Sequence, residues 1–300
     1  MITAIPQGSA IGIVTPAFSL QNPEQIRKGL AYLTEKGFKI NLGEFVYESR
    51  EHFSGSPEER AGDIMRFYKN PEIKAIIATC GGCGSQSLLP YLDYEIIRQN
   101  PKPIIGFSDI TALQNAVYAR SGVGSLAGIM LKYDFIDGQI RSQTENSFEN
   151  YLNGILNPIK AGNIVNSGAA EGVIIGGNLR TFISLAGTPY FPSLHNKILL
   201  LEDVDEKTYN IERMLIQLEQ QPDFEELSAI IFGAFTDCTI NHPEDKDINE
   251  ILSRFAAKHK QLPIIKHFPH GHIKARFCIP IGIKAKLSAL SEVPTLQFAD

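Results

Sequence analysis

The sequence predicts an α/β protein whose parallel sheet carries helices on both faces. In the first half of the chain, short apolar segments of strand length alternate with segments whose apolar residues recur three and four positions apart. This alternation is typical of a parallel sheet flanked by helices. The segment 157–163 is rich in Pro, Gly and Asn, as linkers are. We therefore expect an N-terminal α/β domain over 1–157 and a smaller mixed β/α domain over 164–300.

The elements of the first half follow from this alternation. Ser56 and Glu59, with Pro57 between them, have the spacing of a capping box at a helix start. Strands are expected at 11–16, 38–42, 75–79 and 103–105, and helices at 23–37, from 56 through 67, around 88–89, at 110–118 and at 146–156.

The second half opens with a strand that enters a tight Gly-Gly-Asn turn. Its next strand is continuously aliphatic and ends in two carboxylates, Glu202 and Asp203. Strands are expected at 172–175, 197–203 and 229–232 and in the tail at 278–287, and helices at 179–185, 209–218 and 248–259.

Composition excludes several classes of protein. The chain has 300 residues, 43% hydrophobic and 20% charged, as in an ordinary globular protein. A formal net charge of −5 and scattered Lys and Arg argue against a nucleic-acid partner. No signal peptide and no apolar run of about 20 residues is evident, so we expect no membrane partner. Four cysteines are too few for a disulfide scaffold, and the expected location is the cytoplasm.

Ser108 is the strongest candidate for a nucleophile. It follows Gly106 between an apolar strand and a helix start, where a sharp turn exposes the hydroxyl and the helix N-terminus offers main-chain N–H groups. The pattern resembles the G-x-S-x-G elbow, with Ile110 in place of the second glycine. The alternative is that Ser108 or Asp109 is simply a helix cap. In parallel sheets, sites form where strand ends meet the following turns, and Gly81-Gly82 lies at another such end.

Two further segments could complete a catalytic group. Glu202 could orient a partner or cap the turn after its strand. His272 is the last residue of the segment His267-Phe268-Pro269-His270-Gly271-His272. The three histidines of this segment make a metal site an alternative interpretation. We expect no metal, because this loop lacks Cys or carboxylate at ligand spacing. The order Ser108, Glu202, His272 is the nucleophile–acid–base order of α/β-hydrolases.

A different chemistry is indicated by Cys80-Gly81-Gly82-Cys83. A C-x-x-C between a strand and a helix is a common place for a redox pair, because a helix N-terminus lowers a thiol pKa. A thiol oxidoreductase is therefore the alternative of a different class. Against it, three strands precede the motif, more than a thioredoxin-like start supplies.

Taken together, the motifs resemble those of the LD-carboxypeptidases, a family of serine peptidases, along nearly the whole chain. They occur in the family's order. The matching stretches are Gly81-Gly82 with Gly84-Ser85, 88–93, 106–111, 176–179, 187–190, 201–203, Gly271-His272 and 280–282.

The resemblance implies a site and a fold. Ser108 would be the nucleophile, His272 the general base and acid, and Glu202 the residue that orients His272. The oxyanion hole would come from the N–H of Asp109 and of the Gly81-Gly82 turn. The first domain would be a parallel sheet domain like that of glutamine amidotransferases, the second a mixed β/α domain, and the protein a homodimer without a cofactor. Members commonly have Arg before the Gly-Gly pair and Tyr after it, whereas this chain has Cys80 and Cys83.

The resemblance also implies a substrate, a small peptide. We expect cleavage of the L-diamino acid–D-Ala bond of murein tetrapeptide in peptidoglycan recycling. The alternative within the family is an immunity peptidase that cleaves peptide–nucleotide antibiotics of the microcin C type. Such members stack the nucleobase on a tryptophan, and this chain has none. Its Gly-Gly-x-Gly-Ser turn also differs from their Gly-Gly-x-Asn-Ser form.

Overall fold

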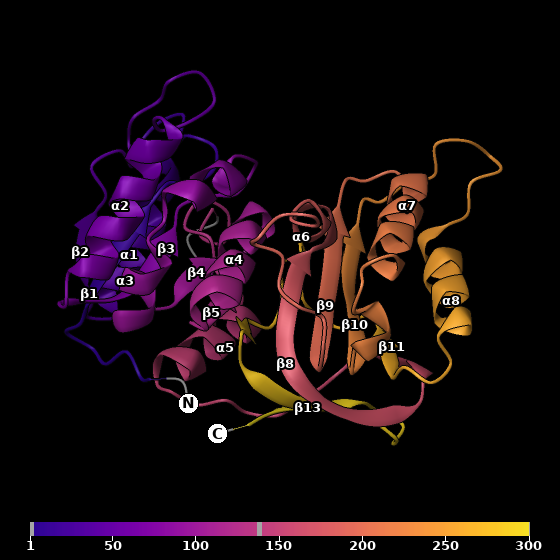
Figure 1. Ribbon diagram of the computed structural model, residues 1–300. Helices are drawn as coiled ribbons and strands as arrows, with labels where there is room; N and C mark the ends of the chain where they lie inside the picture. The colour runs from indigo at the N-terminus through magenta and orange to yellow at the C-terminus, as the bar shows by residue number, and fades with distance from the viewer. Residues whose placement is uncertain (1–2, 137–139, 300) are drawn as a thin grey trace. The chain divides into compact units, whose positions relative to one another are not determined.

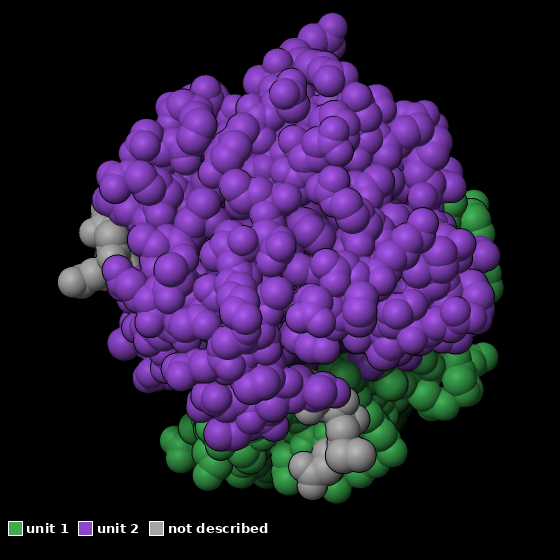
Figure 2. Space-filling view, turned by 90° about the vertical axis from the view of Figure 1, so that its left-hand side faces the viewer, with its two compact units in different colours: residues 1, 156–276, 283–300 green, residues 2–155, 277–282 purple. Residues whose placement is uncertain are grey.

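The computed structural model describes residues 3–136 and 140–299, and its chain divides into two compact units. Unit 2 comprises residues 2–155 and 277–282, and unit 1 comprises residue 1 and residues 156–276 and 283–300. Figure 2 colours unit 2 purple and unit 1 green. The tail thus divides between the units, and the segment 157–163, expected to be a linker, contains strand β6 (Ile159–Lys160) of unit 1.

Unit 2 is built on a sheet with the strand order β12-β5-β4-β3-β1-β2 among the described residues. All its pairings are parallel except that of the edge strand β12, which runs antiparallel to β5. The predicted fold class is confirmed for this unit. Its strands are β1 (Ala10–Val14), β2 (Lys39–Leu42), β3 (Ile73–Ala78), β4 (Ile104–Gly106), β5 (Ser125–Ala127) and β12 (Ile279–Ile281).

Helices connect these strands (Figure 1). The predicted capping box at Ser56 is confirmed, because its hydroxyl accepts from the N–H of Glu59 and the Glu59 carboxylate accepts from the N–H of Ser56. The short helix expected around 88–89 is a 3₁₀ helix. The helical segments are α1 (Glu24–Glu35), α2 (Pro57–Lys69), η1 (Ser85–Tyr91), α3 (Tyr94–Gln99), η2 (Ser108–Ile110), α4 (Thr111–Ser121) and α5 (Ser142–Leu152).

The strand order of unit 2 reverses between β1 and β3. The chain passes from β1 outward to β2, and then crosses back over β1 to β3 and β4. Because parallel crossovers are right-handed, this reversal puts α1 and α2 on opposite faces of the sheet. The carboxyl ends of the strands beside a reversal border an open crevice where ligands bind in such folds. The turns after β3 and β4 carry the glycine pair and Ser108.

Unit 1 is built on a mixed sheet with the order β6-β14-β13-β8-β9-β10-β11-β7 among the described residues. Strands β8 to β11 are parallel, and the pairings outside them are antiparallel. The strands other than β6 are β7 (Asn163–Asn166), β8 (Gly168–Asn178), β9 (Lys197–Val204), β10 (Ala229–Thr236), β11 (Ile264–Lys266), β13 (Lys284–Ala289) and β14 (Thr295–Phe298). The helices are α6 (Leu179–Ile183), α7 (Thr208–Glu219), η3 (Phe224–Glu226) and α8 (Ile248–Lys258).

Aliphatic side chains of the central strands form the core of each unit. Every residue of β1 is buried, and so are Ile198 to Leu201 in β9. Continuous burial along a strand is typical of parallel sheets covered on both faces. No helix in the described part of the chain is long and apolar enough to cross a membrane.

Candidate active site

Ser108 has an unusual main-chain conformation. Its φ angle is +63°, in the left-handed region that costs an L-residue about 1–2 kcal/mol. It opens η2 directly after β4 and Phe107. The residue at the N-cap position of η2 is Phe107 and that of α4 is Ile110, neither with a side-chain cap bond. Neither Ser108 nor Asp109 is therefore the N-cap residue of η2 or α4. Strain of this kind persists where the surrounding structure imposes it, and it is concentrated at functional sites.

The turn after β3 approaches Ser108 closely. A Cβ atom at Gly81 would lie 3.1 Å from both Cβ and Oγ of Ser108, so a side chain there would crowd the hydroxyl. Gly82 has φ +114°, and a Cβ atom there would lie 2.1 Å from the Phe18 ring. Gly82 therefore requires glycine, Gly81 leaves little room for a side chain, and the sequence-predicted residues Gly81 and Ser108 are brought together.

Asp109 connects the two turns. Its Oδ2 accepts a 2.9 Å hydrogen bond from the N–H of Ser85, and its carbonyl accepts a 2.6 Å bond from the Ser85 hydroxyl. Burial raises the pKa of the Asp109 carboxyl, while the bonds to Ser85 and the charge of Arg60 oppose that rise. The start of η1 is thus fastened to the start of η2.

The two cysteines of the C-x-x-C motif lack the environment of a reactive pair. Cys80 is fully buried and its Sγ lies 2.9 Å from the Phe18 carbonyl, to which the thiol donates. Cys83 is exposed, and both thiols are free. Burial raises the pKa of each thiol, the opposite of the shift that activates a redox cysteine. The thiol oxidoreductase alternative is unsupported.

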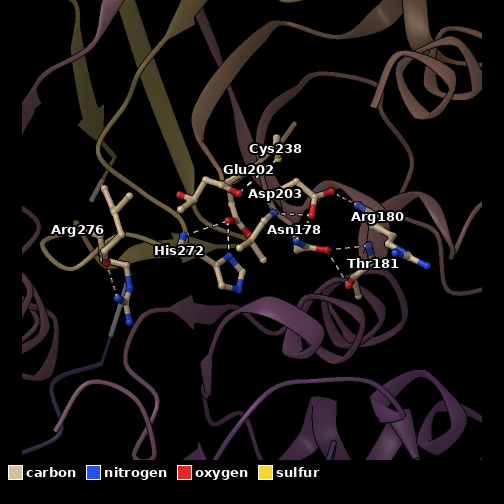
Figure 3. A network of polar contacts seen from close by, with 11 residues as sticks. Asn178, Arg180, Thr181, Glu202, Asp203, Cys238, His272 and Arg276 are labelled. Carbon is tan, nitrogen blue, oxygen red and sulfur yellow. Dashed lines mark hydrogen bonds and ion pairs between the residues drawn. The ribbon is translucent and has the colours of Figure 1, made fainter. Parts of the chain in front are cut away.

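Glu202 and His272 form a hydrogen-bonded pair in unit 1 (Figure 3). Glu202 lies near the carboxyl end of β9, is 1% exposed, and its Oε2 is 2.7 Å from Nδ1 of His272. The main-chain N–H of His272 donates to the same oxygen at 3.2 Å. Because a carboxylate only accepts, Nδ1 carries the ring proton. The orienting role expected for Glu202 has the geometry it needs.

Two glycines make room for this pair. A Cβ atom at Gly271, which has φ +123°, would lie 2.7 Å from Oε2 of Glu202. A Cβ atom at Gly233 would lie 2.5 Å from the His270 carbonyl and 3.2 Å from Cβ of Glu202. The loop that carries His272 can therefore approach β9 only because both positions lack a side chain.

Asp203 organises the turn beside Glu202. It is 2% exposed and accepts hydrogen bonds from Asn178 Nδ2 at 2.8 Å, the N–H of Arg180 at 3.1 Å and the N–H of Val204 at 2.8 Å. Burial, followed by the charge of Glu202, raises the pKa of Asp203 to about 6. The sequence left open whether Glu202 orients a partner or caps the turn after its strand. Of the two carboxylates at the end of β9, it is Asp203 that bonds to this turn.

The other two histidines of the loop lie in different environments from each other. His267 is exposed and lies near Asn163 and Asn249, whereas His270 is 1% exposed. Within residues 3–136 and 140–299, no group of three or more His, Cys, Asp or Glu is arranged to hold a metal ion.

Several buried charges, Arg60 among them, were missed by the sequence analysis. Arg60 on α2 is 3% exposed. The sequence did contain a signal that Arg60 would be buried. Arg60 precedes the buried Ile64 and Phe67 by four and seven residues, and this spacing puts it on the apolar face of the helix.

Comparisons with known proteins agree with this architecture. The family model for the LD-carboxypeptidase N-terminal domain matches residues 11–128, and that for the C-terminal domain matches residues 171–287. A probable murein peptide carboxypeptidase of Bacillus subtilis is 28% identical, covering 98% of this chain and 93% of the relative. The microcin C7 self-immunity protein MccF of Escherichia coli is 30% identical, and the match covers 92% of this chain and 90% of the relative.

Solved structures give the same result. A muramoyltetrapeptide carboxypeptidase from Oxalobacter formigenes superimposes with a TM-score of 0.88 at 28% identity, covering 96% of this chain and 99% of that one. The fold and these matches make the chain a serine-type peptidase, a hydrolase. It belongs to the LD-carboxypeptidase family.

Proposed function

We propose that this protein is a carboxypeptidase that removes the terminal D-Ala from murein tetrapeptide, at the bond after the L-centre of the diamino acid, in peptidoglycan recycling. Ser108 is the nucleophile, His272 the general base and acid, and Glu202 the residue that orients His272. The main-chain N–H groups of Asp109 and of Gly81-Gly82 stabilise the oxyanion.

The proposed reaction has two steps. Ser108 Oγ attacks the carbonyl carbon of the scissile bond and transfers its proton to Nε2 of His272, and the oxyanion is held by the main-chain N–H groups. The C–N bond then breaks, and His272 returns the proton to the amine of D-Ala, leaving an ester on Ser108. Water attacks this ester with His272 as base, which releases the tripeptide and restores the hydroxyl.

The observation that carries the proposal is the bond between the buried Glu202 carboxylate and Nδ1 of His272. It fixes one tautomer and one ring orientation, and it stabilises the imidazolium that forms when the ring takes a proton. Support for the nucleophile comes from the left-handed conformation of Ser108 beside Gly81. The substrate is supported by the relatives whose names state murein peptides.

A second candidate is an immunity peptidase that acts on peptide–nucleotide antibiotics. It is favoured by the similarity to the microcin C7 self-immunity protein, 30% identical. Against it, the chain contains no tryptophan to stack a nucleobase, an interaction worth about 1–3 kcal/mol. We rank the murein substrate first for this reason. We further propose a cytoplasmic homodimer that needs no metal or cofactor, as the family resemblance implies.

The test is a side-by-side measurement of specificity constants. Purified protein is incubated with murein tetrapeptide and, separately, with an aminoacyl sulfamoyl-adenylate, and released D-Ala or sulfamoyl-adenosine is quantified. We expect D-Ala release at a specificity constant about 100-fold above that for the adenylate, a difference of about 2.7 kcal/mol in transition-state binding. Activity should be the same with EDTA. A preference for the adenylate would overturn the substrate assignment, and chelator-sensitive activity restored by zinc would overturn the serine mechanism.

A further inference from the structure

Arg60 is a buried cation that binds main-chain carbonyls from several loops. The residue lies on α2 and is 3% exposed. Its guanidinium donates to the carbonyls of Gly55 (3.1 Å), Pro16 (2.6 Å) and Gly84 (3.3 Å) and to the hydroxyl of Ser87 (3.2 Å). A buried charge without such partners would be strongly destabilising, so this group is held by the acceptors around it.

Two of these acceptors belong to the turn that starts with the glycine pair. Gly84 and Ser87 lie where this turn enters η1, and the Ser87 hydroxyl also donates to the Gly84 carbonyl at 2.7 Å. The Pro16 carbonyl belongs to the loop after β1. Arg60 thus joins the loops at the carboxyl ends of β1 and β3, on either side of the reversal in strand order.

An aromatic ring reinforces the same contact. The Cζ atom of Arg60 lies 4.7 Å from the centroid of the Phe53 ring, in a cation–π arrangement. Gly84 has φ +106°, and a Cβ atom there would lie 2.5 Å from the Phe53 ring and 3.3 Å from Nη1 of Arg60. The turn therefore packs directly on the ring and the guanidinium, without a side chain between them.

The turn is held by opposite charges on its two sides. Arg60 donates to Gly84, while the Asp109 carboxylate accepts from the N–H of Ser85, the next residue. The glycine pair lies three residues earlier, and the Gly81 carbonyl accepts from the N–H of Phe18 at 3.3 Å. The orientation of the peptide groups at Gly81 and Gly82 thus depends on contacts at both ends of one short segment.

We propose that Arg60 is a positioning residue of the peptidase site, which fixes the 81–87 turn so that the N–H groups of the glycine pair point at the developing oxyanion. This inference rests on the proposed function, because it assigns the glycine pair that role. Oxyanion donors act only when they are preorganised, and small misplacements are costly. A planar guanidinium with five donors can hold several acceptors at once, which a lysine ammonium cannot match in geometry.

The test compares Arg60→Lys with Arg66→Lys. Arg66 is a matched control on the same helix, because like Arg60 it lies over a phenylalanine ring. It differs in that its side chain is 46% exposed and pairs with carboxylates. We expect Arg60→Lys to lower kcat for D-Ala release about 10-fold or more with KM changed less than about threefold. Hydrogen exchange of the peptide covering 80–88 should accelerate about 10-fold, while other regions and the control stay at wild-type values.

A second variant covers the case in which Arg60→Lys does not fold. Ser87→Ala removes one acceptor of the guanidinium at an exposed position and should lower kcat and speed exchange in 80–88 in the same sense, by about threefold. Folded Arg60→Lys with wild-type kcat and exchange would overturn the proposal. If Arg60→Lys does not fold and Ser87→Ala does, wild-type kcat and wild-type exchange over 80–88 in Ser87→Ala would overturn the proposal.

The exchange measurement separates this inference from the proposed function. Wild-type protein that releases no D-Ala would contradict the proposed function, whatever Arg60 does. Unchanged exchange over 80–88 in the Arg60 variant would contradict the positioning role even when wild-type protein is active. Lower stability with an unchanged kcat would mean a purely structural role and would also overturn the inference.

Discussion

One carboxylate oxygen of Glu202, Oε2, accepts two hydrogen bonds from His272: one from ring atom Nδ1 at 2.7 Å and one from the main-chain N–H at 3.2 Å. The same acceptor therefore fixes both the ring and the backbone that carries it. Because Glu202 lies on the buried strand β9, the orientation of the ring is set by the core of unit 1.

Glu202→Gln should reduce turnover less than His272→Ala. The amide still offers an oxygen to Nδ1–H, but it cannot stabilise the imidazolium, whereas His272→Ala removes the base itself. We expect kcat to fall about 10³–10⁴-fold in Glu202→Gln and about 10-fold further in His272→Ala. Single-turnover rates of D-Ala release measure both, and equal or reversed losses would contradict the orienting role of Glu202.

Ser108→Ala should abolish hydrolysis, with kcat lowered at least about 10⁴-fold, and should leave the circular dichroism spectrum unchanged. Ser108→Gly should be equally inactive but more stable than Ser108→Ala by about 1 kcal/mol, because glycine adopts φ +63° without strain. Urea unfolding of the two variants compares their stabilities. If Ser108→Ala turned over substrate at the wild-type rate, the serine mechanism would be wrong.

Gly271→Ala should lower both stability and activity. Its Cβ would lie 2.7 Å from Oε2 of Glu202, at a φ of +123° that an L-residue rarely adopts. We expect a loss of about 2–4 kcal/mol in the free energy of unfolding and at least about 100-fold in kcat. Gly187→Ala is the control, because φ is +81° there and a Cβ would meet no atom within 4 Å. Similar losses in both variants would mean that backbone strain, and not contact with Glu202, is the cause.

Asp203 should make the protein less stable as pH rises from about 4 to about 6. Its pKa is raised to about 6 in the folded state from 3.8, so the folded protein holds a proton that the unfolded chain has released in this range. Relative to Asp203→Asn, which does not titrate, the wild-type free energy of unfolding should fall by about 1–3 kcal/mol across this window and stay level above pH 7. A difference that is constant from pH 4 to 7 would contradict the raised pKa.

Replacement of Cys80 and Cys83 by serine, singly and together, should leave kcat/KM within about threefold of wild type, since neither thiol is assigned a chemical step. Because burial raises the pKa of both thiols, alkylation by iodoacetamide at pH 7 should be slower than that of free cysteine. Reduction of insulin disulfides by the wild-type protein would revive the oxidoreductase alternative.

The sequence predicted most of the fold because the information is local. Continuous apolar segments gave β1, β3, β4 and β9 to within a few residues, and the capping box at Ser56 marked the start of α2. Helix bounds were less accurate where caps were weak: α5 spans Ser142–Leu152, whereas 146–156 was expected, and its N-cap residue Arg141 makes no side-chain cap bond. Glu202 and His272 were selected from the strand end and from the family resemblance.

The sequence by itself determined the fold class, the glycine pair after β3 and the residue types available for chemistry, since these follow from periodicity and from residues whose conformational limits are local. The tight turn expected at Gly176-Gly177-Asn178 was wrong, because these residues continue strand β8 and pair with β9. Only the tertiary structure decided which distant segments pair. The strand-rich tail divides, with β12 paired to β5 in one sheet and β13 paired to β8 in the other. Only the fold placed Nδ1 of His272 against Glu202, 70 residues away in the sequence, and buried Arg60 among three main-chain carbonyls and the hydroxyl of Ser87. Contacts over such separations depend on how strands and helices pack together, and no local pattern encodes them.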